Sequence, residues 1–156
     1  MRRALAIALL CSSTAIADPR LGDAAPELAL AGVDGHVVKL PDDPVVVVDF
    51  YATWCGPCHQ ALAALGRIGK ARGFPLVIVD VEEDPAAVRA HVASHPLPEG
   101  ALLVFDRDGA ASRRWGQHRF PTTFVLERGA RGPRIAHINR GYGPDYEKRL
   151  AGWITR

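Results

Sequence analysis

A chain of 156 residues fits a single domain and can bury a hydrophobic core without a metal or several disulfides. Its 48% hydrophobic and 23% charged residues, with no low-complexity tract and no repeat of fixed period, exclude a disordered or repeat protein. The 19 Lys and Arg residues nearly balance the 17 Asp and Glu residues and form no basic run. That balance excludes a nucleic-acid surface and a polybasic membrane patch.

The first 17 residues, MRRALAIALLCSSTAIA, have the pattern of a signal peptide. A basic start precedes an apolar core over residues 4–11 and a small-residue site at residues 15–17. The apolar core is shorter than the about 20 residues that span a bilayer. We therefore predict cleavage before Asp18 and export to the periplasm, with a membrane-anchored form as the lesser alternative. Residues 18–156 then form the mature domain.

Strands open this domain. Two short apolar segments within residues 27–40 surround Asp34-Gly35, a dipeptide typical of a β-hairpin turn. Residues 45–51, VVVVDFY, are β-branched and aromatic apart from Asp49, as in a central strand covered on both faces. An unpaired carboxylate in such a strand is costly to keep ionised. The pKa of Asp49 should therefore rise toward neutrality, where the side chain can accept a proton.

This strand leads to Cys55 and Cys58, the only cysteines left after cleavage. A disulfide between them closes too short a loop to stabilise a domain much, so the spacing favours redox chemistry. Apolar residues then recur at helical spacing, at Cys58, Ala61, Leu62, Leu65 and Ile68. We expect Cys55 to be exposed at the helix N-terminus, where the helix dipole lowers its pKa and makes it the attacking thiolate. Cys58, one turn deeper, is the resolving thiol.

Alternating strands and helices complete the chain. Residues 76–81 form a second buried strand, and Asp84 caps a helix that has Pro85 in its first turn. The remaining predictions are strands over residues 101–105, 122–127 and 134–139, a short helix over 110–115, and a last helix with Tyr146, Leu150, Trp153 and Ile154 on one face. The pattern indicates a mixed α/β sheet.

Two segments carry a family resemblance. Residues 48–58, VDFYATWCGPC, closely resemble the active-site segment of the thioredoxin superfamily, and residues 120–126, FPTTFVL, resemble its cis-proline segment. The signal peptide, the opening PELALAGVDGHVVKLPD and an extra unit over residues 84–107 are similar to exported TlpA/ResA-like thiol-disulfide oxidoreductases. The resemblance implies a thioredoxin-like fold, with a mixed central sheet flanked by helices, an N-terminal β-hairpin and a central strand–helix insertion.

The resemblance also implies roles for particular residues. Asp49 would lie below Cys58 and take its proton, whereas the alternative is an acid hydrogen-bonded to a backbone turn. Only about 5 to 6% of X-Pro bonds are cis in folded proteins, but the family pattern makes a cis bond before Pro121 the expectation. The Phe120 backbone would then pair with an extended substrate segment. The substrate surface implied in this way consists of Trp54, Gly56, Pro57, Phe120, Pro121 and Thr122.

Some residues depart from the family pattern. Arg119 stands where relatives have a small glycine, and it is either a solvated rim residue or a cation that steers acidic partners or stabilises the thiolate. His118 precedes it, and His59, directly after Cys58, is expected at the surface. Ile78 replaces the lysine that plain thioredoxins place near the acid, so proton transfer would depend on Asp49 and water.

The sequence thus predicts an enzyme that exchanges disulfides with protein thiols and needs no cofactor beyond the Cys55–Cys58 pair. Gly-Pro between the cysteines is the thioredoxin dipeptide, which favours reduction. We expect a monomer recharged by a membrane electron donor, and the resemblance adds apocytochrome c thiols to the candidate substrates. The alternative is a metallochaperone that binds Cu(I) or zinc through the two cysteines and His59 or His118.

Overall fold

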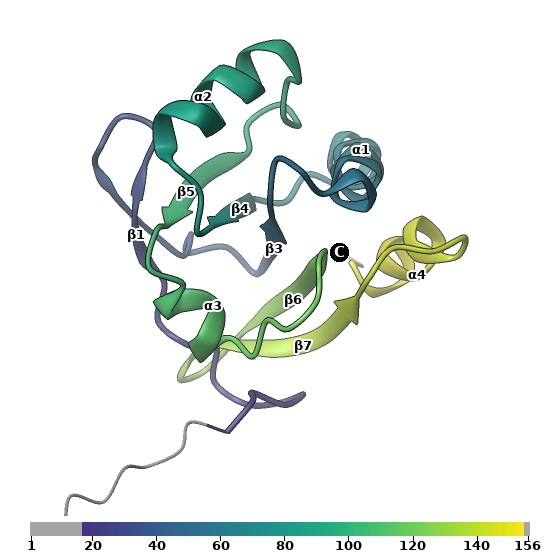
Figure 1. Ribbon diagram of the computed structural model, residues 1–156. Helices are drawn as coiled ribbons and strands as arrows, with labels where there is room; N and C mark the ends of the chain where they lie inside the picture. Colours follow the sequence, from purple (N-terminus) through teal and green to yellow (C-terminus); the bar gives the residue numbers. More distant parts are fainter. Residues whose placement is uncertain (1–16, 155–156) are drawn as a thin grey trace, which may run out of the picture.

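The computed structural model describes residues 17–154, so residues 1–16 of the predicted signal peptide lie outside the described part of the chain. Within it, strands and helices alternate (Figure 1). In chain order they are β1 (Ala29–Gly32), β2 (Val37–Lys39), β3 (Val45–Tyr51), α1 (Gly56–Arg72), β4 (Leu76–Val81), α2 (Pro85–Ser94), β5 (Leu102–Asp106), α3 (Ala110–Arg114), β6 (Thr122–Gly129), β7 (Gly132–Arg140) and α4 (Tyr146–Trp153).

The strands form a seven-stranded mixed sheet in the order β2-β1-β5-β4-β3-β6-β7. β3, β4 and β5 are parallel at its centre, while β1, β6 and β7 join antiparallel to their neighbours. The register matters for the site. Asp49 on β3 lies between Ile78 on β4 and Thr123 on β6, and Tyr51 lies opposite Asp80.

The predicted elements are present, with differences at their ends. β1 and β2 form the expected hairpin, whose turn contains Gly35 at a positive φ of 83°. β5 extends one residue beyond the predicted strand, to Asp106. The buried carboxylate of Asp106 accepts hydrogen bonds from the backbone N–H groups of Ala111 and Ser112 at the start of α3. The expected extra unit forms α2 and β5, and β5 pairs in parallel with β4.

Helices cover both faces of the sheet and enclose two apolar clusters. On one face, α1 and α4 bury their apolar stripes, together with Val88 of α2, against β3, β4 and β6. On the other face, Trp115, just after α3, packs against Phe50 and Phe124. Because side chains alternate along β3, Val47, Asp49 and Tyr51 point to the α1 face. Asp49 therefore lies on the side of the sheet where Cys58 is buried.

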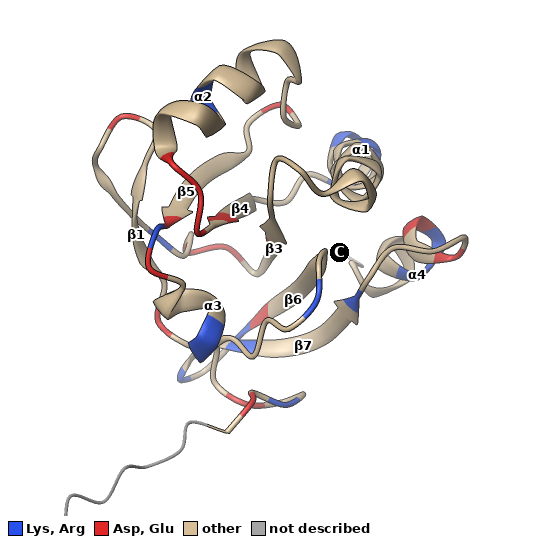
Figure 2. Cartoon of the chain, viewed as in Figure 1, with Lys and Arg blue, Asp and Glu red and all other residues tan. Residues whose placement is uncertain are grey.

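Charged residues of both signs are distributed along the chain (Figure 2). The longest acidic run in that view is the segment Glu82-Glu83-Asp84 between β4 and α2. Within residues 17–154, no helix combines the length and the apolar content needed to cross a membrane.

Candidate redox site

The two cysteines lie where β3 ends and α1 begins. Cys55 is the N-cap of α1 and is joined to Cys58 by a disulfide. The Sγ atom of Cys55 accepts a hydrogen bond from the backbone N–H of Cys58 at 3.2 Å. Pro57 occupies the first turn of the helix, where a backbone N–H has no intrahelical acceptor. The helix start is therefore arranged to stabilise a negative charge on the Cys55 sulfur.

The cysteines differ less in exposure than their positions predict. Cys58 is fully buried, as expected for the deeper thiol, but Cys55 is only 4% exposed. The expectation that Cys55 is an exposed thiol is wrong for this disulfide-bonded state. The cause is the packing of α1 on the sheet, which places Cys55 in the same apolar cluster as Tyr51 and Ala52.

Asp49 is fully buried within β3. The hydroxyl of Thr123 donates to its Oδ1 at 2.6 Å, and the hydroxyl of Tyr146 lies 2.7 Å from that of Thr123. Oδ2 has no hydrogen-bond partner among the described residues. Burial raises the pKa of Asp49 to about 7, although the Thr123 hydrogen bond lowers it in part. The prediction of a raised pKa is confirmed. Asp49 has no ion-pair partner among the described residues, but one of its oxygens accepts a hydrogen bond that the sequence did not predict.

Several residues predicted to contact substrate either adjoin the two cysteines in the chain, as Trp54, Gly56 and Pro57 do, or contact Trp54, as Phe120 does. Trp54 is 69% exposed and meets the Phe120 ring edge to face, with 5.3 Å between ring centroids. The Phe120–Pro121 peptide bond is cis. The Phe120 backbone makes no hydrogen bond within the described residues, which leaves its N–H and C=O available to a partner strand. A Cβ on Gly56 would meet no atom within 4 Å, so the helix start is open beside Pro57.

The residues on either side of Pro121 contact other parts of the protein. Thr122 is buried, and its hydroxyl donates to the backbone carbonyl of Arg119. The Arg119 side chain is exposed and lies along Gly141. His118 is directed elsewhere, because its Nε2 lies 2.9 Å from the carboxylate of Asp18.

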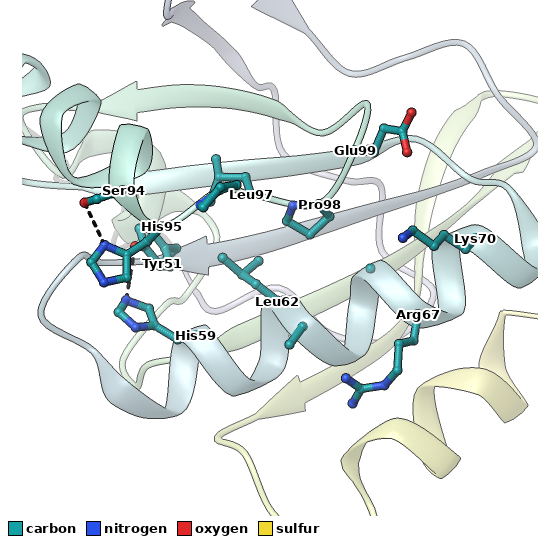
Figure 3. Close-up of a pocket in the computed structure, with 13 residues that line it drawn as sticks. Tyr51, His59, Leu62, Arg67, Lys70, Ser94, His95, Leu97, Pro98 and Glu99 are labelled. Carbon is teal, nitrogen blue, oxygen red and sulfur yellow. Dashed lines mark hydrogen bonds between the residues drawn. The ribbon is translucent and has the colours of Figure 1, made fainter.

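His59 is not the plain surface residue that its sequence position suggests. Its ring stacks on Tyr51, whose hydroxyl lies 3.3 Å from Nε2, and it also adjoins the rings of His91 and His95 on the α2 side. Tyr51, His59 and His95 form one end of a cavity of about 640 Å³ between α1 and the connection from α2 to β5 (Figure 3). Leu62, Leu97 and Pro98 line its middle, and Arg67, Lys70 and Glu99 lie toward the other end.

The metal-binding alternative finds no ligand set within residues 17–154. No group of three or more His, Cys, Asp and Glu side chains is placed to hold a metal ion there. Of the two histidines named as candidate ligands, either of which would serve, His118 is paired with Asp18, and His59 contacts Tyr51.

The sequence analysis did not identify the residues that hold the cysteine loop and Asp49 in place. Glu83 accepts hydrogen bonds from the backbone N–H and the hydroxyl of Thr53, two residues before Cys55. Asp80 is a second buried acid, 1% exposed. Like Asp49, it interrupts an apolar strand, so the same signal was available in LVIVDV. Thr123, which donates to Asp49, and Tyr146, whose hydroxyl contacts that of Thr123, carried no comparable local signal.

Comparisons with known proteins agree with this geometry. The family model described as Redoxin matches residues 20–151. A thiol:disulfide interchange protein DsbE homolog of Paracoccus denitrificans is 30% identical over 150 residues, which are 88% of this chain and 81% of that protein. Thiol-disulfide oxidoreductase ResA of Bacillus cereus is 24% identical over 113 residues, 69% of this chain, and the match spans 64% of the length of ResA.

Comparison with solved structures identifies the fold. A putative thiol:disulfide interchange protein DsbE from Chlorobium tepidum superposes with a TM-score of 0.77 at 32% identity, covering 88% of this chain and 96% of that one. StoA from Bacillus subtilis shares the fold with a TM-score of 0.66 at 18% identity, covering 84% of this chain and 98% of StoA. The mixed sheet and helices are thus the expected thioredoxin-like fold. With the match over residues 20–151, the chain belongs to the Redoxin family.

Proposed function

We propose that this chain is a thiol-disulfide oxidoreductase that reduces disulfides in proteins outside the cytoplasm. The observation that carries the proposal is the Cys55–Cys58 disulfide at the first turn of α1, with the Cys55 sulfur held on a backbone N–H. The names of the relatives, an interchange protein and a thiol-disulfide oxidoreductase, agree with this activity. The location is inferred from the signal-peptide pattern of residues 1–17.

The proposed reaction starts from the reduced pair. The Cys55 thiolate attacks a substrate disulfide, forms a mixed disulfide and releases one substrate thiolate. Cys58 then gives its proton to the carboxylate of Asp49 and attacks the Cys55 sulfur. The Cys55–Cys58 disulfide forms, and the second substrate sulfur leaves as a thiolate that takes up a proton. Two electrons pass to the substrate, so the pair itself is the redox centre and no further cofactor is required.

Asp49 suits this proton transfer because of its pKa. With a pKa raised to about 7 by burial, the carboxyl is populated in both protonation states near neutral pH. Asp49 and Cys58 are both fully buried on the α1 side of β3, which supports a transfer between them directly or through one water.

The substrate surface that we propose comprises Trp54, Gly56, Pro57 and the segment from Phe120 to Thr122. An extended substrate segment would pair with the free backbone groups of Phe120, while the exposed Trp54 ring covers it from the side. A domain that works as a monomer and is recharged by a membrane electron donor completes the proposal.

The direction of electron flow is tested by the reduction potential. Gly-Pro is the dipeptide between the cysteines of thioredoxin, whose potential is about −270 mV, against about −120 mV for the strong oxidant DsbA. We expect the Cys55–Cys58 couple, titrated against glutathione and read by alkylation and mass spectrometry, to lie near the thioredoxin value. A potential near that of DsbA would overturn the reductase direction.

A further inference from the structure

Besides Asp49, two further carboxyl groups, those of Asp80 and Glu83, lie next to the loop that carries Cys55. Asp80 is on β4, one residue before its end, and Glu83 follows in the acidic segment between β4 and α2 that Figure 2 shows. The reaction proposed above uses neither of them. Tyr51, the last residue of β3, pairs with Asp80 across the sheet. Burial and, to a smaller extent, the charges of Asp80 and Glu83 raise the pKa of Tyr51 to about 12.

Glu83 holds the loop between β3 and α1 at Thr53. Its Oε2 accepts the backbone N–H of Thr53 at 2.6 Å, and its Oε1 accepts the hydroxyl of the same residue. These contacts join positions 30 residues apart. The only other backbone hydrogen bond described within this loop runs from the N–H of Cys55 to the carbonyl of Ala52 at 3.1 Å. Glu83 is thus the residue outside this loop whose hydrogen bonds hold the turn that leads to Cys55.

Asp80 lacks a donor of its own. It is 1% exposed, pairs across the sheet with Tyr51 and Phe105, and neither carboxyl oxygen accepts a hydrogen bond from the described residues. A buried carboxyl without donors is stable only when it keeps its proton. The neighbouring Glu83 carboxylate can accept that proton in a hydrogen bond.

Among residues 17–154, no Lys or Arg side chain forms an ion pair with Asp80 or Glu83. The titratable groups around this pair are the phenol of Tyr51 on β3 and the imidazoles of His59 on α1, His91 on α2 and His95 just after α2. The guanidinium of Arg89 on α2 lies over the ring of Phe105, which pairs with Asp80 across the sheet. Burial, a hydrogen bond with the Glu83 side chain and the negative charge of Glu83 raise the pKa of Asp80 to about 8. Below about pH 8 Asp80 therefore keeps its proton, next to the side chain that holds Thr53.

We propose that Asp80 and Glu83 act together as positioning residues for the attacking cysteine: protonated Asp80 donates to Glu83, and Glu83 holds the N–H and hydroxyl of Thr53 in the turn that leads to Cys55. When Asp80 loses its proton, two adjacent carboxylates repel each other and the hold on Thr53 weakens. The redox site is then fully ordered below about pH 8 and loosens above it. The effect of this change on disulfide exchange rests on the proposed function, but the contact between Glu83 and Thr53 does not.

The test measures amide hydrogen exchange at Thr53 by NMR between pH 6.5 and 9.5. In the wild type we expect the protection factor, which already corrects for base-catalysed exchange, to fall about tenfold as the pH passes 8. Glu83→Gln should lower it about tenfold at every pH, because a neutral amide presents one acceptor oxygen to two donors. Asp80→Asn, whose amide still donates to Glu83 and cannot lose a proton, should keep the protection and abolish the fall.

Glu82→Gln is the matched control, since Glu82 is a neighbouring acid whose carboxylate faces Arg113 at 3.9 Å. It should behave as the wild type. Alkylation of reduced Cys55 by iodoacetamide, followed over the same pH range, should show an added step near pH 8 in the wild type and Glu82→Gln but not in Asp80→Asn. Thermal melting confirms that each variant is folded.

Two results would overturn the proposal. One is unchanged Thr53 protection in folded Glu83→Gln, and the other is a pH-dependent fall that persists in Asp80→Asn. Failure of the proposed function gives a different pattern: the Thr53 results would stand as expected while the wild type reduced no protein disulfide.

Discussion

Cys58→Ser should accumulate as mixed disulfides through Cys55 when it is expressed in its native compartment. Cys55 still attacks, because it lies at the N-cap of α1, where its sulfur accepts a hydrogen bond from the backbone N–H of residue 58. Without the Cys58 sulfur, no thiol of the protein can resolve the mixed disulfide. Turnover in insulin reduction should therefore drop to the uncatalysed background. Non-reducing gels should show larger species that collapse with dithiothreitol.

Cys55→Ser is the matched variant for this trap. Cys58 is fully buried, so it should form few or no mixed disulfides by itself. Mass spectrometry of the trapped species would then tell a cytochrome-maturation substrate from a broad set of misoxidised proteins. Equal trapping by both variants would contradict the division of labour between the two thiols.

Asp49→Asn should slow the resolution of mixed disulfides by roughly 10²-fold near neutral pH, because it removes the proton acceptor for Cys58. The same variant should be more stable than the wild type. The native pKa of about 7 exceeds the unfolded value of 3.8, so the wild type loses stability through this group as the pH rises from about 4 to 7. The gain should be near zero at pH 4 and reach a few kcal/mol, roughly 2 to 4, above pH 7. Denaturant unfolding at both pH values measures it.

Thr123→Val separates the proton-transfer role of Asp49 from its place in the core. The Thr123 hydroxyl lowers the pKa of Asp49 by donating to Oδ1, so its removal should raise that pKa and move the pH profile of resolution to higher pH. Single-turnover reduction of insulin between pH 5 and 9 measures the profile. A profile that stays in place in Thr123→Val, or a turnover unchanged in Asp49→Asn, would exclude Asp49 as the acceptor.

What the sequence determined by itself is local. The apolar run with one acid, the two cysteines with Pro57 between them and the helical stripe after them each span a few turns or one strand. Backbone propensity and burial act at that range, so β3, α1 and the cysteine pair were predictable from residues 45–68. The raised pKa of Asp49 followed from the same run, because burial is its largest cause.

Only the tertiary structure decided which side chains meet. Asp49 and Thr123 are 74 residues apart and become neighbours through the pairing of β3 with β6. Thr53 meets Glu83 because β4 lies beside β3 and ends at the same edge of the sheet. The small exposure of Cys55 likewise depends on how α1 packs on the sheet. Such contacts depend on strand order and register, which long-range packing sets and no local pattern encodes.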